Sequence, residues 1–454
     1  MRTLFGTDGV RGLANVEPMT GETVMRLGRA AAAIFKNGSG RHRIVIGKDT
    51  RRSGYMLESA LTSGICSMGV DVIQVGPMPT PAVAFLTRSL RADAGIMISA
   101  SHNSFEDNGI KFFCREGLKL PDEMERRIEA FVLDDVLSAT LPTADAIGRA
   151  YRVEGAEGRY VEFVKNSLPR GLDFQGLKVV VDCAHGAAYK VAPTVLRELG
   201  AEVTVIGDTP NGININRDCG AVHPDALQKE VVARGADVGV AHDGDADRTV
   251  FVAETGDVIH GDAVLAAFAF ALHQDGLLRQ NRVVATVMSN IGLQTALQTR
   301  GISLIRTDVG DRYVLERLLK EGGNFGGESS GHVVFLDHNT TGDGLITALQ
   351  WLCLMKKTGK TASNLAACLT LLPQVTINVR VARKDNLADV PGFSSALARC
   401  EGTLNGRGRI LARYSGTEML FRVMVEGEDA TCIQTVANDL ADRVRQHAGI
   451  QEGR

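Results

Sequence analysis

The sequence predicts an α/β fold of three similar domains with mainly parallel, mixed sheets, followed by a smaller C-terminal α+β domain. Three observations support this prediction. Short apolar runs alternate with helix-like stretches, this order of elements occurs three times along the 454 residues, and the hydrophobic pattern changes after about Leu372. Alternating strand and helix signals are typical of α/β domains, whereas strands with one exposed face indicate an α+β arrangement.

The first three domains are predicted from a repeated order of strands. Each copy begins with an apolar run that ends in a turn, at residues 42–47, 177–182 and 282–287. A helix-like stretch and a strand led by glycine follow, the strands being at 69–73, 200–205 and 301–305. A third strand precedes a polar loop, at 92–98, 236–241 and, more weakly, 323–326. Such runs indicate parallel strands covered on both faces, and so long a period indicates repeated domains rather than a solenoid.

The fourth domain is predicted from a different pattern. Residues 375–381 and 421–425 alternate between apolar and polar like half-exposed strands. The last segment places five apolar residues on one helical face: Ile433, Val436, Ala437, Leu440 and Val444. A prior of roughly 150 residues per domain suggests three domains or so, and the repeats raise this number to four. The predicted bounds are 1–155, 156–255, 256–371 and 372–454.

Composition excludes several classes of protein. The chain is 44% hydrophobic and 23% charged, with a formal net charge of -3 and no long basic run, so nucleic acid is not an expected partner. Eight dispersed cysteines without any Cys-x-x-Cys fit reduced thiols better than a disulfide framework or a zinc site. No signal peptide begins the sequence, and its longest apolar stretch, 263–272, is half of the ~20 residues that a membrane span needs. We therefore expect a soluble, cytoplasmic protein.

In each of the three copies, one polar loop follows the third strand. They read Ser99-Ala100-Ser101-His102-Asn103, Asp243-Gly244-Asp245-Ala246-Asp247-Arg248 and Gly327-Glu328-Ser329-Ser330-Gly331-His332. Ligands of open α/β sheets gather beyond the carboxyl ends of the strands, which is where these loops are expected. Their equivalent positions predict one shared functional site.

The second loop carries three closely spaced carboxylates, Asp243, Asp245 and Asp247. Alternation along an extended backbone would place them on one side, where oxygen ligands suit Mg²⁺, Mn²⁺ or Ca²⁺. An EF-hand is excluded because Arg248 occupies the position that requires glycine and a strand-like run follows. A solvated acidic turn remains the alternative. The planar guanidinium of Arg248 suits a phosphate.

The first loop offers Ser101 as a candidate nucleophile. In isolation, Ser-His-Asn is more often a polar turn whose side chains bond to the backbone. Opposite a metal cluster the nucleophile is favoured, because a phosphorylated serine needs a cation to neutralise its charge. Lys111, on the strand after this loop, is a candidate proton shuttle if its pKa is depressed.

The remaining motifs are weaker by themselves. Glycines in the third loop would let the backbone approach a ligand, with Glu328 and Ser330 bonding sugar hydroxyls or an amine, although an ordinary glycine-rich turn is equally compatible. The last domain carries a candidate phosphate nest, for which a surface β-turn is the alternative: Arg413, Ser415, Gly416, Thr417 and Arg422. The N-terminal glycine-spaced loop, 6–12, presents Arg11.

Two nucleotide motifs are excluded. Gly359-Lys360-Thr361 ends like a P-loop, but Leu354 stands where that motif needs glycine, and a helical stretch precedes it instead of a strand. No Gly-x-Gly-x-x-Gly opens a helix after a strand, so a dinucleotide cofactor is unsupported.

Taken together, these motifs resemble the α-D-phosphohexomutase superfamily over essentially the full chain, and most of all its bacterial members that act on glucosamine phosphate. The resemblance implies four domains around a central cleft and a small-molecule sugar phosphate as the partner, with a homodimer as a further expectation. It implies a covalent phosphate on Ser101, and one Mg²⁺ per active site held by that group together with Asp243, Asp245 and Asp247. It also implies glucosamine 1,6-bisphosphate as intermediate and activator.

The same resemblance implies a role for each remaining site residue. Arg11 and Arg248 would steady the transferring phosphoryl group, and Lys111 and His332 are the candidate general acid and base. Glu328 and Ser330 would contact the sugar hydroxyls. Five residues would grip the phosphate that does not react: Arg413, Ser415, Gly416, Thr417 and Arg422.

The implied reaction interconverts glucosamine 6-phosphate and glucosamine 1-phosphate, which would supply UDP-N-acetylglucosamine and cell-wall precursors. A phosphomannomutase or phosphoglucomutase with the same mechanism, and a phosphoserine-dependent phosphatase, are the alternatives. A non-catalytic sugar-phosphate sensor is disfavoured by the complete set of reacting groups. The chain departs from the family at Ser104 and Met419, where proline is frequent. These two positions affect loop rigidity rather than the reacting groups.

Overall fold

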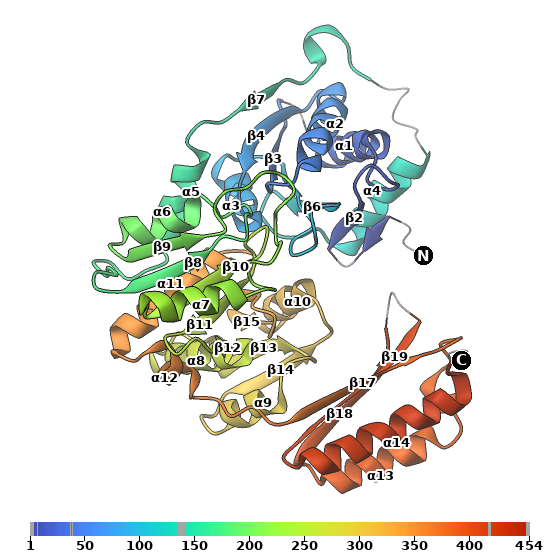
Figure 1. The fold of residues 1–454 in the computed structure, drawn as a ribbon. Coiled ribbons are helices and arrows are strands. Elements are labelled where there is room, and N and C mark those ends of the chain that lie inside the picture. Colours follow the sequence, from blue (N-terminus) through green and yellow to red (C-terminus); the bar gives the residue numbers. More distant parts are fainter. Residues whose placement is uncertain are drawn as a thin grey trace. The chain divides into compact units, whose positions relative to one another are not determined.

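The computed structural model describes residues 4–6, 8–36, 38, 40–134, 141–415 and 419–450. The chain divides into two compact units. Unit 1 comprises residues 1–286 and 305–367, and unit 2 comprises residues 287–304 and 368–454. Each of the four sheets is built from strands that are consecutive in the sequence (Figure 1).

The first sheet, in unit 1, has the strand order β1-β2-β6-β5-β3-β4-β7. Its strands are β1 (Phe5–Gly6), β2 (Gly9–Leu13), β3 (Arg43–Lys48), β4 (Asp71–Pro77), β5 (Ala94–Ile98), β6 (Asp107–Cys114) and β7 (Ala150–Arg152). Strands β5, β3 and β4 and the edge strand β7 run parallel, whereas β6, β2 and β1 are added in antiparallel pairs. The prediction of a mainly parallel, mixed sheet is confirmed for this copy.

Helices cover both faces of the first sheet. They are α1 (Gly21–Phe35), α2 (Ser53–Ser67), α3 (Thr80–Ser89) and α4 (Asp122–Asp134). One face buries Ile44 and Ile96 in a common core with α1, α2 and α4. On the other face α3 comes so close that a Cβ at Gly95 would lie 2.1 Å from the Oγ1 of Thr87. Apolar side chains therefore point both ways, which explains the continuous apolar runs of these strands.

The second sheet, also in unit 1, has the order β12-β11-β10-β8-β9. Its strands are β8 (Lys178–Asp182), β9 (Glu202–Ile206), β10 (Val238–His242), β11 (Thr249–Ala253) and β12 (Val258–Ile259). Strands β9, β8 and β10 are parallel, and the hairpin β11–β12 continues the sheet antiparallel. The neighbouring helices are α5 (Ala156–Lys165), α6 (Val191–Glu198) and α7 (Asp225–Arg234). Because the acidic loop enters β11 rather than a helix, the exclusion of an EF-hand is confirmed.

The third sheet has the order β14-β13-β15-β16. Its strands are β13 (Arg282–Thr286), β14 (Ser303–Thr307), β15 (Phe325–Gly327) and β16 (Val333–Phe335), and its helices are α8 (Gly261–Gln274), α10 (Asp311–Glu321), α11 (Gly344–Thr358) and α12 (Ala362–Ala366). The rings of Phe268 and Phe335, from α8 and β16, meet edge to face with centroids 5.1 Å apart. Helix α11 ends at Gly359 in a left-handed conformation, so the Gly-Lys-Thr sequence follows a helix, as predicted.

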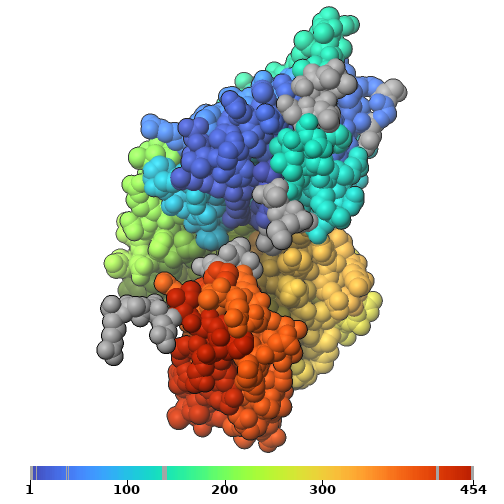
Figure 2. Space-filling view, turned by 90° about the vertical axis from the view of Figure 1, so that its right-hand side faces the viewer, coloured from blue at the N-terminus to red at the C-terminus, as the bar shows by residue number. Residues whose placement is uncertain are grey.

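Unit 2 contains an antiparallel sheet of order β17-β19-β18, with strands β17 (Gln374–Arg380), β18 (Gly408–Tyr414) and β19 (Leu420–Gly427). Its helices are α9 (Ile291–Gln298), α13 (Phe393–Leu404) and α14 (Ala430–Ala448). The five apolar residues predicted to share one helical face are all buried on α14. The C-terminal part of the chain, orange to red in Figure 2, gathers into one body. The predicted α+β domain is thereby confirmed.

Short 3₁₀ helices are also present among the described residues: η2 (Ala144–Ala146), η3 (Arg279–Asn281) and η4 (Leu387–Asp389). None of the helices in the described part of the chain combines the length and the apolar character that a membrane crossing requires.

Asp343 begins α11 and gives a testable pH dependence. Its carboxylate accepts hydrogen bonds from the N–H groups of Leu345 and Ile346 and, at 2.9 Å, from the hydroxyl of Tyr160. Burial raises the pKa of this carboxyl from 3.8 to about 6. Because folding then favours the protonated form, the contribution of Asp343 to stability falls as the pH rises from about 4 to about 6.

Substitution of Asp343 by asparagine should remove this dependence while keeping a good N-cap. We expect the thermal midpoint of the wild type to fall relative to that of Asp343→Asn as the pH is raised through this window. Differential scanning calorimetry at several pH values measures the difference. A difference that stays constant, or that changes in favour of the wild type, would contradict the raised pKa.

Candidate active site

Ser101 lies in the turn directly after β5 and is held against the acidic loop. Its Oγ donates a hydrogen bond of 2.6 Å to the Oδ2 of Asp243, and its backbone N–H donates to the Oγ of Ser99 at 2.9 Å. The residue is 2% exposed and has a φ of 53°, a left-handed conformation that costs energy for a residue with a side chain. The structure thus brings together the two loops that the sequence placed at equivalent positions.

Two polar side chains fix the backbone of this turn. Arg51, fully buried and paired with Asp49, donates to the carbonyl oxygens of Ser101 and Asn103 at 3.1 and 2.6 Å. Asn216 donates to the same two oxygens, at 2.9 Å each. Nothing in the local sequence singled out Arg51 or Asn216. They stabilise the strained turn because each bonds two of its carbonyl groups at once.

A glycine permits the two loops to approach each other. A Cβ at Gly244 would lie 2.6 Å from the carbonyl oxygen of Ser101, well inside van der Waals contact. The glycine between the first two aspartates is therefore required by the close packing of the serine turn.

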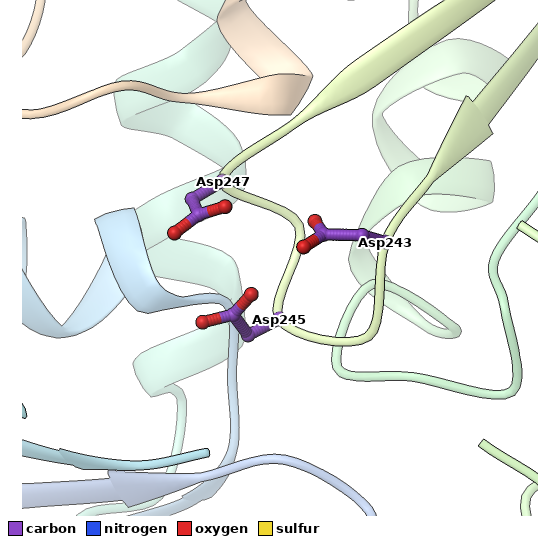
Figure 3. Close-up of side chains that lie close together, drawn as sticks. All are labelled: Asp243, Asp245 and Asp247. Atoms are coloured by element: carbon purple, nitrogen blue, oxygen red, sulfur yellow. The ribbon is translucent and has the colours of Figure 1, made fainter. Parts of the chain in front are cut away.

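The three aspartates converge in the turn between β10 and β11, and Figure 3 shows their carboxylates directed toward one another. One oxygen from each of Asp243, Asp245 and Asp247 lies within 4.8 Å of the others, and all three residues are buried. The extended backbone assumed from the sequence was wrong. The segment forms a tight turn in which Ala246 has a φ of 54°, and this turn directs the carboxylates inward.

The donor set of this cluster fits a hard divalent cation. Oδ1 of Asp245 and Oδ1 of Asp247 are buried without a hydrogen-bond partner. Burial, with the charges of Asp247 and Asp245 next, raises the pKa of Asp243 to about 8. A bound cation would supply the missing partner for both oxygens and remove the repulsion that raises this pKa. Carboxylate oxygens alone favour Mg²⁺, Mn²⁺ or Ca²⁺ over softer metals.

Lys111 projects from β6 into the cluster. Its Nζ lies 2.9 Å from Asp245, 3.2 Å from Asp247 and 3.0 Å from Asp8. Burial alone would lower the pKa of this lysine, but the three carboxylates outweigh it and raise the pKa well above 10.5. The depressed pKa that would make Lys111 a proton shuttle is therefore not found. The three acidic neighbours come from other segments, which sequence reasoning did not bring to this lysine.

Two guanidinium groups lie beside the same cluster. Arg11, on β2, donates to Asp8 at 2.5 Å, and Asp8 and Asp245 raise its pKa against the effect of burial. Arg248 donates its backbone N–H to Asp243 at 3.2 Å, and its Nε lies 4.0 Å from Asp247 without a hydrogen bond. Both cations also help lower the pKa of His102, next to Ser101, to about 4, although burial is the larger cause. This arrangement offers positive charge to an anion at Ser101.

The third loop, between β15 and β16, brings His332 to the acidic cluster. His332 is 2% exposed, with Nδ1 3.7 Å from Asp247 and Nε2 3.3 Å from Asp311. Burial lowers the pKa of this imidazole, but Asp311 and Asp247 raise it more. Glu328 is buried, accepts from the N–H of Gly310 at 3.1 Å and has a pKa raised by burial, whereas Ser330 is exposed at the tip of the loop.

Gly342 forms a wall behind His332, and enlarging it should displace the imidazole. A Cβ at Gly342 would lie 2.2 Å from the Nε2 of His332. Because a misplacement of about 1 Å can cost on the order of 100-fold in rate, we expect Gly342→Ala to reduce turnover by at least about tenfold. Steady-state kinetics measures this effect. The control is Gly158→Ala on α5, where a Cβ meets nothing within 4 Å. Equal activity of the two variants would show that a side chain at position 342 does not displace His332.

The sequence did not reveal several residues that complete the site. Thr80, at the start of α3, donates its hydroxyl to Asp245 at 2.5 Å. Asp8 belongs to the glycine-spaced N-terminal loop, whose pattern could have pointed to it. Lys119 and Asp311 pair with each other at 2.5 Å across 192 residues, and neither lies in a recognisable motif.

The candidate phosphate nest lies in unit 2. Arg413 on β18 and Arg422 on β19 are register partners on neighbouring strands, and Ser415, directly after β18, is buried. The Nζ of Lys384 donates to the carbonyl of Ser415 at 2.7 Å. Gly416 and Thr417 lie outside the described residues, so the nest as a whole stays a prediction.

Comparison with known proteins identifies the family. Models of phosphoglucomutase/phosphomannomutase match successive parts of the chain: alpha/beta/alpha domain I at residues 2–136, domain II at 158–256, domain III at 260–371 and the C-terminal domain at 377–443. A protein of Citrifermentans bemidjiense named phosphoglucosamine mutase is 58% identical over 449 residues, 99% of each chain. One of Geobacter metallireducens with the same name is 56% identical, covering 99% of this chain and 100% of the relative.

Solved structures share the fold at lower identity. A phosphoglucomutase/phosphomannomutase family protein of Burkholderia thailandensis has a TM-score of 0.78 and 22% identity, with 98% of this chain and 97% of that chain covered. An N-acetylphosphoglucosamine mutase of Aspergillus fumigatus, solved with GlcNAc-6P and magnesium, has a TM-score of 0.67 and 18% identity, with 98% and 96% covered. The matched domains and the full-length relatives agree with the clustered loops, and the chain belongs to the phosphoglucomutase/phosphomannomutase family of α-D-phosphohexomutases, which are isomerases.

Proposed function

We propose that this phosphohexomutase interconverts glucosamine 6-phosphate and glucosamine 1-phosphate, through a phosphoserine at Ser101 and glucosamine 1,6-bisphosphate. The observation that carries the proposal is the 2.6 Å hydrogen bond from Ser101 to Asp243 inside the aspartate cluster. The amino sugar is supported by full-length relatives at 52–58% identity that bear the name phosphoglucosamine mutase. The product would supply UDP-N-acetylglucosamine and cell-wall precursors.

The proposed reaction transfers a phosphoryl group twice. In the first transfer, the bond between phosphorus and the Ser101 oxygen breaks, a bond to O1 of glucosamine 6-phosphate forms, and the O1 proton leaves to a general base. The bisphosphate then turns around, and its 6-phosphate returns to Ser101 while O6 takes up a proton. Such turning requires one anion site that accepts either phosphate, which we assign to Arg413, Ser415, Gly416, Thr417 and Arg422. Exclusion of water while the phosphoserine is reactive protects it from hydrolysis.

The side chains around Ser101 would share the charge of the transfer. One Mg²⁺ per site, held by Asp243, Asp245, Asp247 and the Ser101 phosphate, would supply electrostatic stabilisation. Arg11 and Arg248 would bond the phosphoryl oxygens, because their guanidiniums already border the cluster. Lys111 and His332 would be the general acid and base, and Glu328 and Ser330 would orient the sugar. The raised pKa of Lys111 favours it as an acid over a base.

Further features of the proposal concern organisation and location. We assign the four domains to residues 1–155, 156–255, 256–371 and 372–454. The reaction is placed in the cytoplasm, in agreement with eight cysteines that are all free thiols. Assembly as a homodimer stays a prediction, which size-exclusion chromatography with light scattering measures.

The decisive experiment compares three substrates under identical conditions. Purified protein, Mg²⁺ and catalytic bisphosphate are given the 6-phosphates of glucosamine, mannose or glucose, and 1-phosphate formation is followed. We expect glucosamine phosphate to have the highest kcat/KM. A preference for mannose or glucose would overturn the assigned sugar, and rapid release of inorganic phosphate without isomerised sugar would indicate a phosphatase.

A further inference from the structure

Six side chains in unit 1, alternately acidic and basic, form a closed ring that includes the candidate acid and base, Lys111 and His332. In order they are Asp8, Lys111, Asp247, His332, Asp311 and Lys119. Four of the six contacts of the ring are made by Lys111 and His332. Lys111 lies 3.0 Å from Asp8 and 3.2 Å from Asp247, and His332 lies 3.7 Å from Asp247 and 3.3 Å from Asp311.

Lys119 closes the ring. Its Nζ lies 2.6 Å from the Oδ1 of Asp8 and 2.5 Å from the Oδ2 of Asp311. The other carboxylate oxygen of Asp8 contacts Lys111, so Asp8 bridges the two lysines. The side chains of Lys119 and Asp311 are 10% and 16% exposed, which limits the competition of water for these contacts.

The backbone around Lys119 is held in place on two sides. Lys119 pairs across a tight turn with Phe113 of β6, and Leu118 packs against the core that α10 and β16 share. The hydroxyl of Thr340, two residues before Gly342, donates to the carbonyl of Gly117 at 2.7 Å. Because Asp311 begins α10, the ion pair joins this turn to the helix beside His332.

We propose that Lys119 and Asp311 are positioning residues, which fix His332 and Asp8 through this ring and so align His332 and Lys111 on either side of Asp247. Neither residue belongs to the set of reacting or sugar-binding groups assigned above. The charge of Asp311 lies 3.3 Å from Nε2 of the imidazole, a contact without a hydrogen bond, and Nδ1 faces the aspartate cluster. Lys119 bonds Asp311 and Asp8 at the same time, because without it two partly buried carboxylates would lie close together with no cation between them.

A purely stabilising role predicts a different result. Buried ion pairs contribute little net stability in many proteins, since desolvation offsets their attraction. If the ring only supported the fold, substitutions in it would lower the thermal midpoint and leave the kinetics of the folded fraction unchanged. The positioning role requires kcat to fall in protein that remains folded.

The test uses Lys119→Met, Asp311→Asn and their double variant in the full chain, with glucosamine 6-phosphate as the substrate. We expect kcat to fall roughly 10- to 100-fold, the range typical of groups that orient reacting residues. KM should stay within about twofold, because no sugar contact is removed. The double variant should be no slower than the slower single variant, since both substitutions open the same ring. Lys119→Arg, which retains the charge, should recover part of the lost kcat.

The matched control is Arg312→Met, at the residue next to Asp311. Arg312 lies on α10, like Asp311, but outside the ring, and it pairs with Glu125 of α4 at 3.0 Å. We expect its thermal midpoint to fall and its kcat to stay within about twofold of the wild type. Unchanged kcat in the two folded single variants, fully additive losses, or an equal kcat loss in Arg312→Met would each overturn the positioning role.

This inference rests on the proposed function for its readout, and the two can fail separately. Absence of isomerase turnover in the wild type would count against the proposed function. Normal turnover in the wild type together with unaffected ring variants would count against the ring alone.

Discussion

Replacement of Ser101 by alanine is expected to abolish isomerisation while the protein stays folded. The hydroxyl is the protein group that the proposed mechanism phosphorylates, and its Oγ already contacts Asp243 at 2.6 Å. Loss of a covalent nucleophile removes the reaction path itself, so we expect kcat to fall by at least about 1,000-fold. Coupled kinetics measures turnover, and intact-mass spectrometry shows whether the added mass of one phosphate is lost with the side chain.

The control for this variant lies in the same loop. Ser104 is exposed, and its side chain hydrogen-bonds that of Glu106, so Ser104→Ala should retain the phosphate and at least about half of the wild-type activity. Turnover like that of the wild type in Ser101→Ala would exclude the phosphoserine mechanism. Phosphate mapped to another residue of an active wild type would contradict the assignment of Ser101 equally.

Asp245→Asn is expected to have the second largest effect, through loss of the cation. The substitution keeps the size of the side chain but removes a charge from a cluster whose oxygens lie within 4.8 Å of one another. Oδ1 of Asp245 is buried without a hydrogen-bond partner, which is the position that a cation would fill. We expect a loss of at least about 100-fold in turnover at a Mg²⁺ concentration that saturates the wild type, exceeding the typical effect of groups that only orient ligands.

Cation binding can be measured without turnover. Mg²⁺ should raise the thermal midpoint of the wild type, because a ligand that binds only the folded state stabilises it. The rise should be absent or much smaller in Asp245→Asn. Asp257→Asn, at an exposed acid of the β11–β12 hairpin in the same sheet, should respond to Mg²⁺ like the wild type. An equal Mg²⁺-induced rise in Asp245→Asn would show that the cluster is not the cation site.

The fold was largely predictable because its signals are local. Strands β3, β8 and β13 are continuous apolar runs, and nearly all of their residues are buried. The apolar residues of each run therefore predict a buried strand directly. The alternating residues of β17 and the apolar face of α14 were predicted for the same reason. A period of 2 or of 3.6 residues needs only the neighbouring residues to be recognised.

The loops of the site were also predicted, but their geometry was not. The sequence indicated that Ser101 and the aspartates end equivalent strands, which was enough to expect them together. It wrongly suggested an extended backbone for the aspartates, because an alternating spacing fits a strand and a tight turn equally well. It also left the pKa of Lys111 undetermined, since its three acidic neighbours come from two other segments.

The sequence by itself therefore determined the order of strands and helices, the chemical groups at the ends of the strands and, through its motifs, the family. Only the tertiary structure decided that Arg51 and Asn216 hold the serine turn and that Lys119 and Asp311 meet across 192 residues. Such pairs carry no local signal, because a buried charge is stabilised by whichever partner the fold brings to it, and sequence separation does not limit that choice.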